Sequence, residues 1–177
     1  MSTMIEVGPE HVVEVLHALG ATMVAEKRSE ADILVGYEVS PPIDLSSYDA
    51  ELAAFRKTAL VAHLKARRWQ AETAGITATI GGEAVRVSTT RGDDRAALHQ
   101  VCTAISGGLR SDGAVFNFAD GVSRGVSNAE MQAVVLAALA HVQACFDLEG
   151  TLRAAIEAGI LTTKEEIDAA SWPADVT

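Results

Sequence analysis

Apolar residues follow a helical spacing over a long central stretch of the chain. Between residues 48 and 69 they recur every three or four positions, which places them on one face of a helix. The members of this face are Tyr48, Leu52, Phe55, Ala59, Ala62, Ala66 and Trp69. Ser46 or Ser47 is expected to cap the start of this helix, and Gly75 to end it.

A two-residue hairpin is predicted directly after this helix. Residues 76–80 and 83–89 are joined by Gly81-Gly82, and glycine supplies the positive φ angles that a tight hairpin turn requires. One register keeps the apolar residues of both strands on the same face. Its pairs are Ile76 with Val87, Ala78 with Val85 and, on the other face, Thr77 with Arg86.

A second helix and a second hairpin come next. Asp93 is expected to cap a helix that ends at Gly107-Gly108. Its apolar face consists of Leu98, Val101, Cys102 and Ile105. The second hairpin turns at Asp120-Gly121, between strands at residues 114–118 and 122–126.

The last long apolar stripe predicts a helix that begins after Ser127, which has capping-box spacing with Glu130. Its face holds Met131, Val134, Val135, Ala138, Val142, Cys145, Phe146, Leu152 and Ile156, and Gly159 ends it. Gly150 inside the helix costs about 1 kcal/mol against alanine, which would allow a bend there. A short helix starting at Thr162 or Thr163 and ending at Trp172-Pro173 completes the pattern.

The first part of the chain has a different organisation. Pro9 and Glu10 are expected to open a helix that Gly20 ends, and strand-like runs follow at residues 22–25 and 33–39. This is an αββ piece. Ser40-Pro41-Pro42 then forbids a continuous helix or central strand. We therefore predict an attachment region at residues 1–43 and a second domain at 44–177.

These elements together predict an α+β fold. Two hairpins form an antiparallel sheet that packs against amphipathic helices, with the small αββ extension at the N-terminus. The length of 177 residues fits one domain with such an extension, and 49% apolar residues are enough to fill a core.

The net charge of −10 narrows the classes of partner. Binding to nucleic acid or to an anionic membrane surface requires an excess of lysine and arginine, so neither partner is expected. The longest uninterrupted apolar run, residues 133–140, is too short to cross a bilayer, and the acidic N-terminus does not have the pattern of a signal peptide. Cys102 and Cys145 lie on apolar helix faces, which indicates free thiols in a reducing cytoplasm.

Groups that could carry chemistry are present but lack a motif. His63, His99 and His141 fall on three predicted helices, and the chain has no HExxH pattern, so no metal site is predicted. The acidic pairs Asp93-Asp94 and Glu165-Glu166 lie where helix N-termini favour negative charge. The tripeptide Arg91-Gly92-Asp93 is interpreted as a loop. We predict no catalytic residues and no cofactor.

One alternative remains from the spacing of His141 and Cys145. They are four residues apart and would share a helix side, as a small hydrolase with a Cys-His pair would need. A different kind of site is indicated at Arg67, Arg68, Trp69 and Glu72. Tryptophan and arginine are enriched in interaction hot spots, and Arg68 and Glu72 can form a surface ion pair. Trp69 itself is expected to pack on the sheet.

Several of these motifs occur together in a known family. They are Arg67 and Arg68 with Glu72 and Gly75, then Gly81, Asp120-Gly121, the segment His141, Val142, Cys145 and Phe146, and the tail Thr163, Glu166, Ile167 and Asp168. Over about residues 46–172 the chain resembles the DUF4376 family of bacteriophage tail-associated proteins. It departs from the family pattern at residues 122–125, where relatives carry an aromatic and β-branched arm.

The resemblance implies a structural role in the virion tail, in a fibre or a baseplate, after synthesis in the host cytoplasm. It assigns no catalytic residues. The implied partners are other phage tail proteins and further copies of the chain, with a trimer as the expected homo-oligomer. A tail-fibre assembly chaperone is the alternative, because an acidic, alanine-rich chain suits that role equally well.

Overall fold

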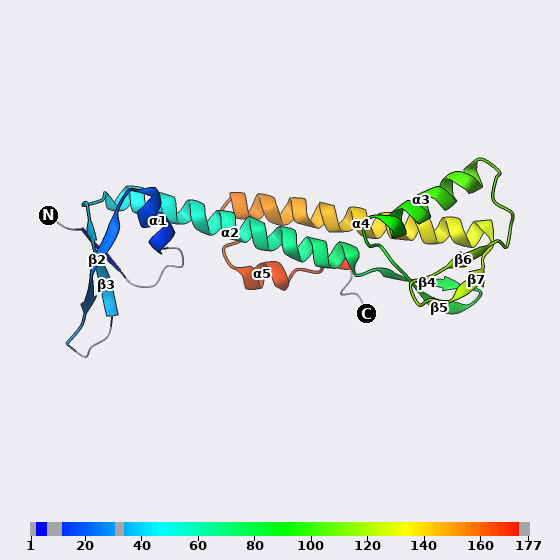
Figure 1. Cartoon of the computed structure of the whole chain (residues 1–177), viewed down its shortest axis with the longest axis horizontal. Helices are drawn as coiled ribbons and strands as arrows, with labels where there is room; N and C mark the ends of the chain where they lie inside the picture. Colours follow the sequence, from blue (N-terminus) through cyan, green and yellow to red (C-terminus); the bar gives the residue numbers. More distant parts are fainter. Residues whose placement is uncertain (1–2, 7–11, 31–33, 174–177) are drawn as a thin grey trace. The chain divides into compact units, whose positions relative to one another are not determined.

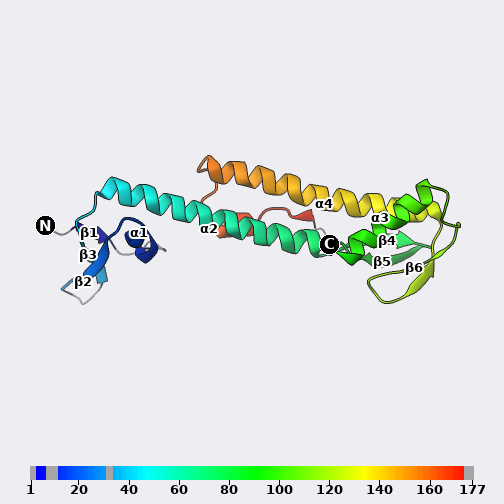
Figure 2. The ribbon, with the colours of Figure 1, turned by 45° about the horizontal axis from the view of Figure 1, so that its top comes forward.

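The computed structural model describes residues 3–6, 12–30 and 34–173. The chain divides into two compact units, Met1–Ala62 and His63–Thr177. Figure 1 and Figure 2 show the elements of each unit in two views. The division falls inside the long helix α2 (Leu45–Thr73), whose first part belongs to the first unit and whose last part belongs to the second.

The first unit is built on a three-stranded antiparallel sheet. Its elements are β1 (Thr3–Glu6), α1 (Val12–Ala18), β2 (Thr22–Arg28) and β3 (Leu34–Ser40), and the strand order is β1-β3-β2. The predicted αββ piece is therefore βαββ, because a strand of four residues near the N-terminus leaves too short a pattern to detect. The predicted helix start at Pro9 and Glu10 lies outside the described residues, and Gly20 follows α1 with a φ of 68°.

The core of the first unit includes the beginning of α2. Ile5, Val15, Leu16, Ala21 and Val39 pack together with Tyr48 and Leu52. β3 ends at Ser40, next to the two prolines, as the sequence indicates. The compact units thus divide after residue 62, whereas the sequence places a boundary after residue 43. Independent folding of residues 44–177 stays a prediction.

The second unit contains the two hairpins and three further helices. Its elements after α2 are β4 (Ile76–Ile80), β5 (Glu83–Val87), α3 (Asp93–Ser106), β6 (Val115–Asn117), β7 (Ser123–Gly125), α4 (Asn128–Glu157) and α5 (Lys164–Asp168). The α+β class is confirmed. The hairpins form two separate two-stranded sheets rather than one joined sheet.

The first hairpin has the predicted register. Ile76 pairs with Val87, Ala78 with Val85 and Thr77 with Arg86. The second hairpin is shorter than predicted, with three residues in each strand, and Phe116 pairs with Arg124. Figures 1 and 2 both show α3 lying beside the first half of α4, with the hairpins at the same end.

A single apolar cluster joins these parts of the second unit. Its buried members are Ile80, Val85, Val87, Leu98, Phe118, Val126, Met131, Val134, Val135 and Ala138, so both hairpins, α3 and α4 contribute. The apolar faces predicted for α3 and for the first half of α4 therefore lie in the core.

The predicted caps of α4 and α5 are present, whereas the starts of α2 and α3 differ from the predictions. The capping boxes of Ser127 with Glu130 and of Thr163 with Glu166 are both present. Asp44 caps α2 in place of Ser46 or Ser47, because its carboxylate accepts a hydrogen bond from the Ser47 backbone N–H at 3.0 Å. Asp93 is the first residue of α3, and Gly92 before it offers no side-chain cap.

The helix α4 continues through Gly150 to Glu157. Among the described residues it is the one helix whose length and composition would let it cross a membrane, with a mean hydropathy of 1.5 over its most apolar window. A core helix of a soluble protein passes the same test, and 33% of that window is buried in the fold. The expected absence of a membrane partner stays a prediction.

Candidate functional site

A fully buried carboxylate surrounded by three arginines lies at the end of α2. Glu72 is 0% exposed and forms an ion pair with Arg68, which precedes it by one helical turn. Arg91 Nε lies 2.6 Å from Glu72 Oε1, and Arg95 Nη2 lies 3.0 Å from the same oxygen. We call these four residues, together with Glu149, the Glu72 cluster.

The first hairpin brings the distant arginines to Glu72. Gly75 ends the helical region with a φ of 85°, and a Cβ atom there would lie 2.7 Å from the Val87 carbonyl oxygen, so only glycine fits. The Gly75 N–H donates to Thr89 Oγ1 at 3.0 Å. Thr89 Oγ1 in turn donates to the Glu72 carbonyl at 2.6 Å, which fixes the chain just before Arg91.

Two further contacts hold the arginines in place. Arg95 Nε donates to the Thr89 carbonyl at 2.7 Å. Arg68 Nε lies 2.8 Å from Glu149 Oε2 of α4, as an ion pair without a directed hydrogen bond. α2, α3, α4 and the loop after β5 therefore meet at the Glu72 cluster.

The arginines determine the charge state of Glu72. Burial raises the pKa of this carboxyl, but hydrogen bonds from Arg91, Arg95 and Arg68 outweigh burial, and the net pKa lies below its usual value. The same hydrogen bond raises the pKa of Arg91. Glu72 is therefore a carboxylate at neutral pH whose oxygens are engaged by guanidinium groups.

Aromatic side chains cover the outer side of the cluster. Trp69 is 45% exposed and Phe146 is 40% exposed. The Arg91 guanidinium carbon lies 4.9 Å from the Trp69 ring centroid and 6.0 Å from that of Phe146, and Arg68 lies 4.6 Å from Phe146. We call Trp69, Arg91 and Phe146 the Trp69 surface. The expectation that Trp69 packs on the sheet is wrong.

The predicted site residues thus separate into three environments. Arg68 and Glu72 form the predicted pair, but Glu72 is buried rather than on the surface. The Trp69 ring contacts Arg91. Arg67 contacts Trp172 instead, with its guanidinium carbon 5.4 Å from the ring centroid. Trp172 is the buried tryptophan, and its Nε1–H donates to the Ile167 carbonyl at 2.9 Å.

Sequence reasoning missed Arg91, Arg95, Phe146 and Glu149. Each lies too far along the chain from Glu72 for a periodic pattern to connect them. The turn assigned to Arg91-Gly92-Asp93 is present, with a φ of 92° at Gly92. A signal was available in Arg91 and Arg95, which are four residues apart across a helix start and can therefore approach one acceptor.

The histidines have separate hydrogen-bond partners. His141 Nε2 lies 3.0 Å from the Ala71 carbonyl oxygen, so the imidazole donates there, and His63 Nε2 lies 2.9 Å from Asp168 Oδ1. His99 is exposed on α3. Within residues 3–6, 12–30 and 34–173, no group of three or more His, Cys, Asp or Glu side chains could hold a metal ion.

Both cysteines are free thiols. Cys145 is fully buried, and burial raises its pKa above the ordinary thiol value. A nucleophilic cysteine requires the opposite shift toward the thiolate. The burial and raised pKa of Cys145, and the hydrogen bond of His141 to Ala71, therefore give no support to a Cys-His nucleophile. Cys102 is half-buried against the core.

The second unit is thus an α+β fold in which the Glu72 cluster joins α2, α3, α4 and the loop after β5. A domain of unknown function, DUF4376, matches residues 55–171, and the chain belongs to this family. No curated protein and no solved structure matches the chain. The matched region begins inside α2 and includes every residue of the Glu72 cluster.

Proposed function

We propose that this chain is a structural component of a bacteriophage tail, in a fibre or baseplate, that mediates protein–protein assembly. The observation that carries the proposal is the Trp69 surface, an exposed aromatic and arginine patch supported by a buried ion cluster. The location in a tail comes from the resemblance of the sequence to tail-associated proteins. The partners proposed are other tail proteins and further copies of the chain, with a trimer as the best estimate.

The Trp69 surface has the chemistry of a binding hot spot. Tryptophan and arginine dominate such spots because they bury a large area and also offer polar contacts. Arg91 is already held by Glu72 and stacked on Trp69, so little side-chain freedom would be lost on binding. A surface whose side chains are already held in place lowers the cost of binding a partner protein.

The polar groups of the second unit support a role without catalysis. The carboxylate of Glu72 is engaged by arginines, and its lowered pKa makes it a weak base. The raised pKa of Cys145 disfavours the thiolate. The Glu72 carboxylate holds helices and a loop together, as a structural protein requires.

The test combines particle analysis with substitution of the Trp69 surface. Mass spectrometry of purified particles should detect the chain, and Trp69→Ala should reduce its incorporation at least about tenfold. Leu109→Ala is the matched control, because Leu109 is 84% exposed and lies outside the surface. Equal incorporation of both variants would contradict the assignment of the surface.

An assembly chaperone is the second candidate, because the same surface would suit a transient partner. A chaperone binds fibre chains in the host cytoplasm and is absent from finished particles. Presence in infected-cell lysates together with absence from purified particles would select this alternative.

A further inference from the structure

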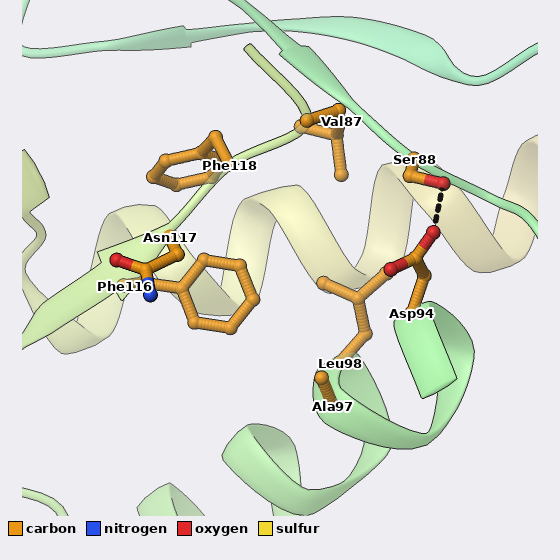
Figure 3. Close-up of a pocket in the computed structure, with 9 residues that line it drawn as sticks. Val87, Ser88, Asp94, Ala97, Leu98, Phe116, Asn117 and Phe118 are labelled. Atoms are coloured by element: carbon orange, nitrogen blue, oxygen red, sulfur yellow. Dashed lines mark hydrogen bonds between the residues drawn. The ribbon is translucent and has the colours of Figure 1, made fainter. Parts of the chain in front are cut away.

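A pocket lies in the same unit, and none of its lining residues belongs to the Glu72 cluster. Figure 3 shows a pocket of about 430 Å³ between the end of β5, the first turns of α3 and the strand β6. Its larger apolar residues are Val87, Leu98, Phe116 and Phe118, and its polar residues are Ser88, Asp94 and Asn117. The volume lies within the range of pockets that take small organic ligands.

The apolar side chains of the pocket are held in place by core packing. Val87, Leu98 and Phe118 are buried members of the core of the second unit. Phe116 and Phe118 meet edge to face, with ring centroids 5.0 Å apart. In Figure 3 the Phe116 ring and the Val87 side chain face the same space as the Asp94 carboxyl.

The polar part carries one negative charge. Asp94 accepts a hydrogen bond from Ser88 Oγ through Oδ2, and Figure 3 shows its second carboxyl oxygen turned toward the pocket. The described lining contains no lysine or arginine. Arg124 approaches the Phe118 ring at 5.8 Å, but it does not line the pocket and is paired with Asp120 at 2.8 Å.

We propose that this pocket binds an organic cation, namely an ammonium group carried on an aliphatic or arylalkyl body. The body packs against Val87, Leu98 and Phe116, and the ammonium group donates to Asp94. Aromatic rings and a carboxylate both attract a cation, and a charge-assisted hydrogen bond is stronger than a neutral one. The net charge of −10 attracts cations and repels anions.

The experiment compares three ligands with one skeleton on the full chain. Phenethylammonium, phenethyl alcohol and hydrocinnamate share a phenylethyl body and differ in the charge of the end group. NMR titration should give phenethylammonium an affinity at least about tenfold above the alcohol, with hydrocinnamate weakest. Equal affinities for the ammonium and the alcohol would overturn the proposal.

Two variants locate the binding. Asp94→Asn keeps the shape and the acceptor for Ser88, and it should weaken phenethylammonium about tenfold while leaving the alcohol unchanged. Asp93→Asn is the matched control, because Asp93 lies in the same helical turn and does not line the pocket. Phe116→Leu should weaken phenethylammonium and the alcohol alike, because their shared body packs on Phe116, and this variant locates the binding if Asp94→Asn fails to fold. An ammonium affinity unaffected by either pocket variant would overturn the proposal.

The same cation could come from a small amine or from a lysine of a polypeptide. Titration with the blocked peptide acetyl-Leu-Lys-Leu-amide separates these sources. Tighter binding of the peptide than of phenethylammonium assigns the pocket to a lysine side chain, and the reverse assigns it to a small amine. Neither result depends on a role in a phage tail.

Discussion

Glu72 carries a negative charge to a place that solvent does not reach. Removing an ion from water costs several kcal/mol, and only close opposite charges offset that cost. Arg68, Arg91 and Arg95 provide those charges from three different segments of the chain. The three arginines therefore share one buried carboxylate, and Arg68 alone of the three also pairs with Glu149.

Replacing Glu72 should destabilise the second unit strongly. In Glu72→Gln the three guanidinium groups lose their common counter-charge, and we expect the free energy of unfolding to fall by about 3 kcal/mol. Chemical denaturation measures this change. Glu149→Gln is the control, because Arg68 keeps Glu72 as a partner, and a loss of about 1 kcal/mol is expected. Equal losses would mean that Glu72 is not the centre of the cluster.

The lowered pKa of Glu72 predicts how its contribution depends on pH. The folded-state pKa lies below the ordinary value of 4.5, so the deprotonated form favours folding. Its stabilisation is fully present above the unfolded-state pKa and is lost as the pH falls through the folded-state pKa. The stability difference between the wild type and Glu72→Gln should therefore be constant near neutral pH and shrink in acid. A difference that grows on acidification would contradict the assignment.

At the scale of single elements, the turn of the first hairpin offers a direct test. Gly81 and Gly82 have φ angles of 57° and 85°, and a Cβ atom at either position would meet no other atom within 4 Å. The cost of Gly81→Val is therefore conformational rather than steric. We expect a loss of about 1–3 kcal/mol in thermal unfolding, because β-branched residues rarely adopt positive φ. An unchanged melting temperature would place the turn elsewhere.

Replacing Gly150 should raise stability, in contrast to replacing Gly81. It lies on the exposed side of the continuous helix α4, and a Cβ atom there would contact nothing. Gly150→Ala should therefore stabilise the second unit by about 0.5–1 kcal/mol, because alanine loses less backbone entropy in a helix. A melting temperature that falls would show that Gly150 serves a bend or a partner.

Elements with a local signal could be predicted from the sequence. The hairpin register followed from the Gly-Gly turn and the alternation beside it, and both capping boxes followed from their three-residue spacing. Choices between near-equal local options could not be settled, as with Asp44 and Ser46 at the start of α2. The two tryptophans could not be ranked by burial either, because Trp69 has helical spacing and Trp172 follows a short helix.

At the scale of the whole molecule, the sequence predicted the α+β class and the Arg68–Glu72 pair, but not the residues that reach this pair from other segments. Arg68 and Glu72 share a helix and could be paired by spacing. Arg91 and Arg95 reach the same carboxylate only because the hairpin returns to the end of α2. Such a contact depends on tertiary structure and leaves no periodic trace. The pocket at Asp94 was missed for the same reason, since its walls come from three separate segments.

The predicted boundary after residue 43 can be tested by truncation. The apolar cluster of both hairpins, α3 and α4 lies entirely after residue 63, so a fragment of residues 44–177 should keep its cooperative unfolding transition. The truncation exposes Tyr48 and Leu52, which pack in the core of the first unit. We expect the fragment to be soluble, and we expect hydrogen exchange to show fraying at the start of α2. Aggregation of the fragment would place the boundary elsewhere.

The Glu72 cluster also constrains how this chain can change over evolutionary time. A single replacement of Glu72 removes the carboxylate that Arg91 and Arg95 contact, and a single replacement of an arginine weakens the hold on a buried negative charge. Viable lineages should therefore replace these positions together, for example by apolar residues of similar volume. Positions 68, 72, 91 and 95 would then covary among relatives, and a double-mutant cycle on Glu72 and Arg95 would give a non-additive stability.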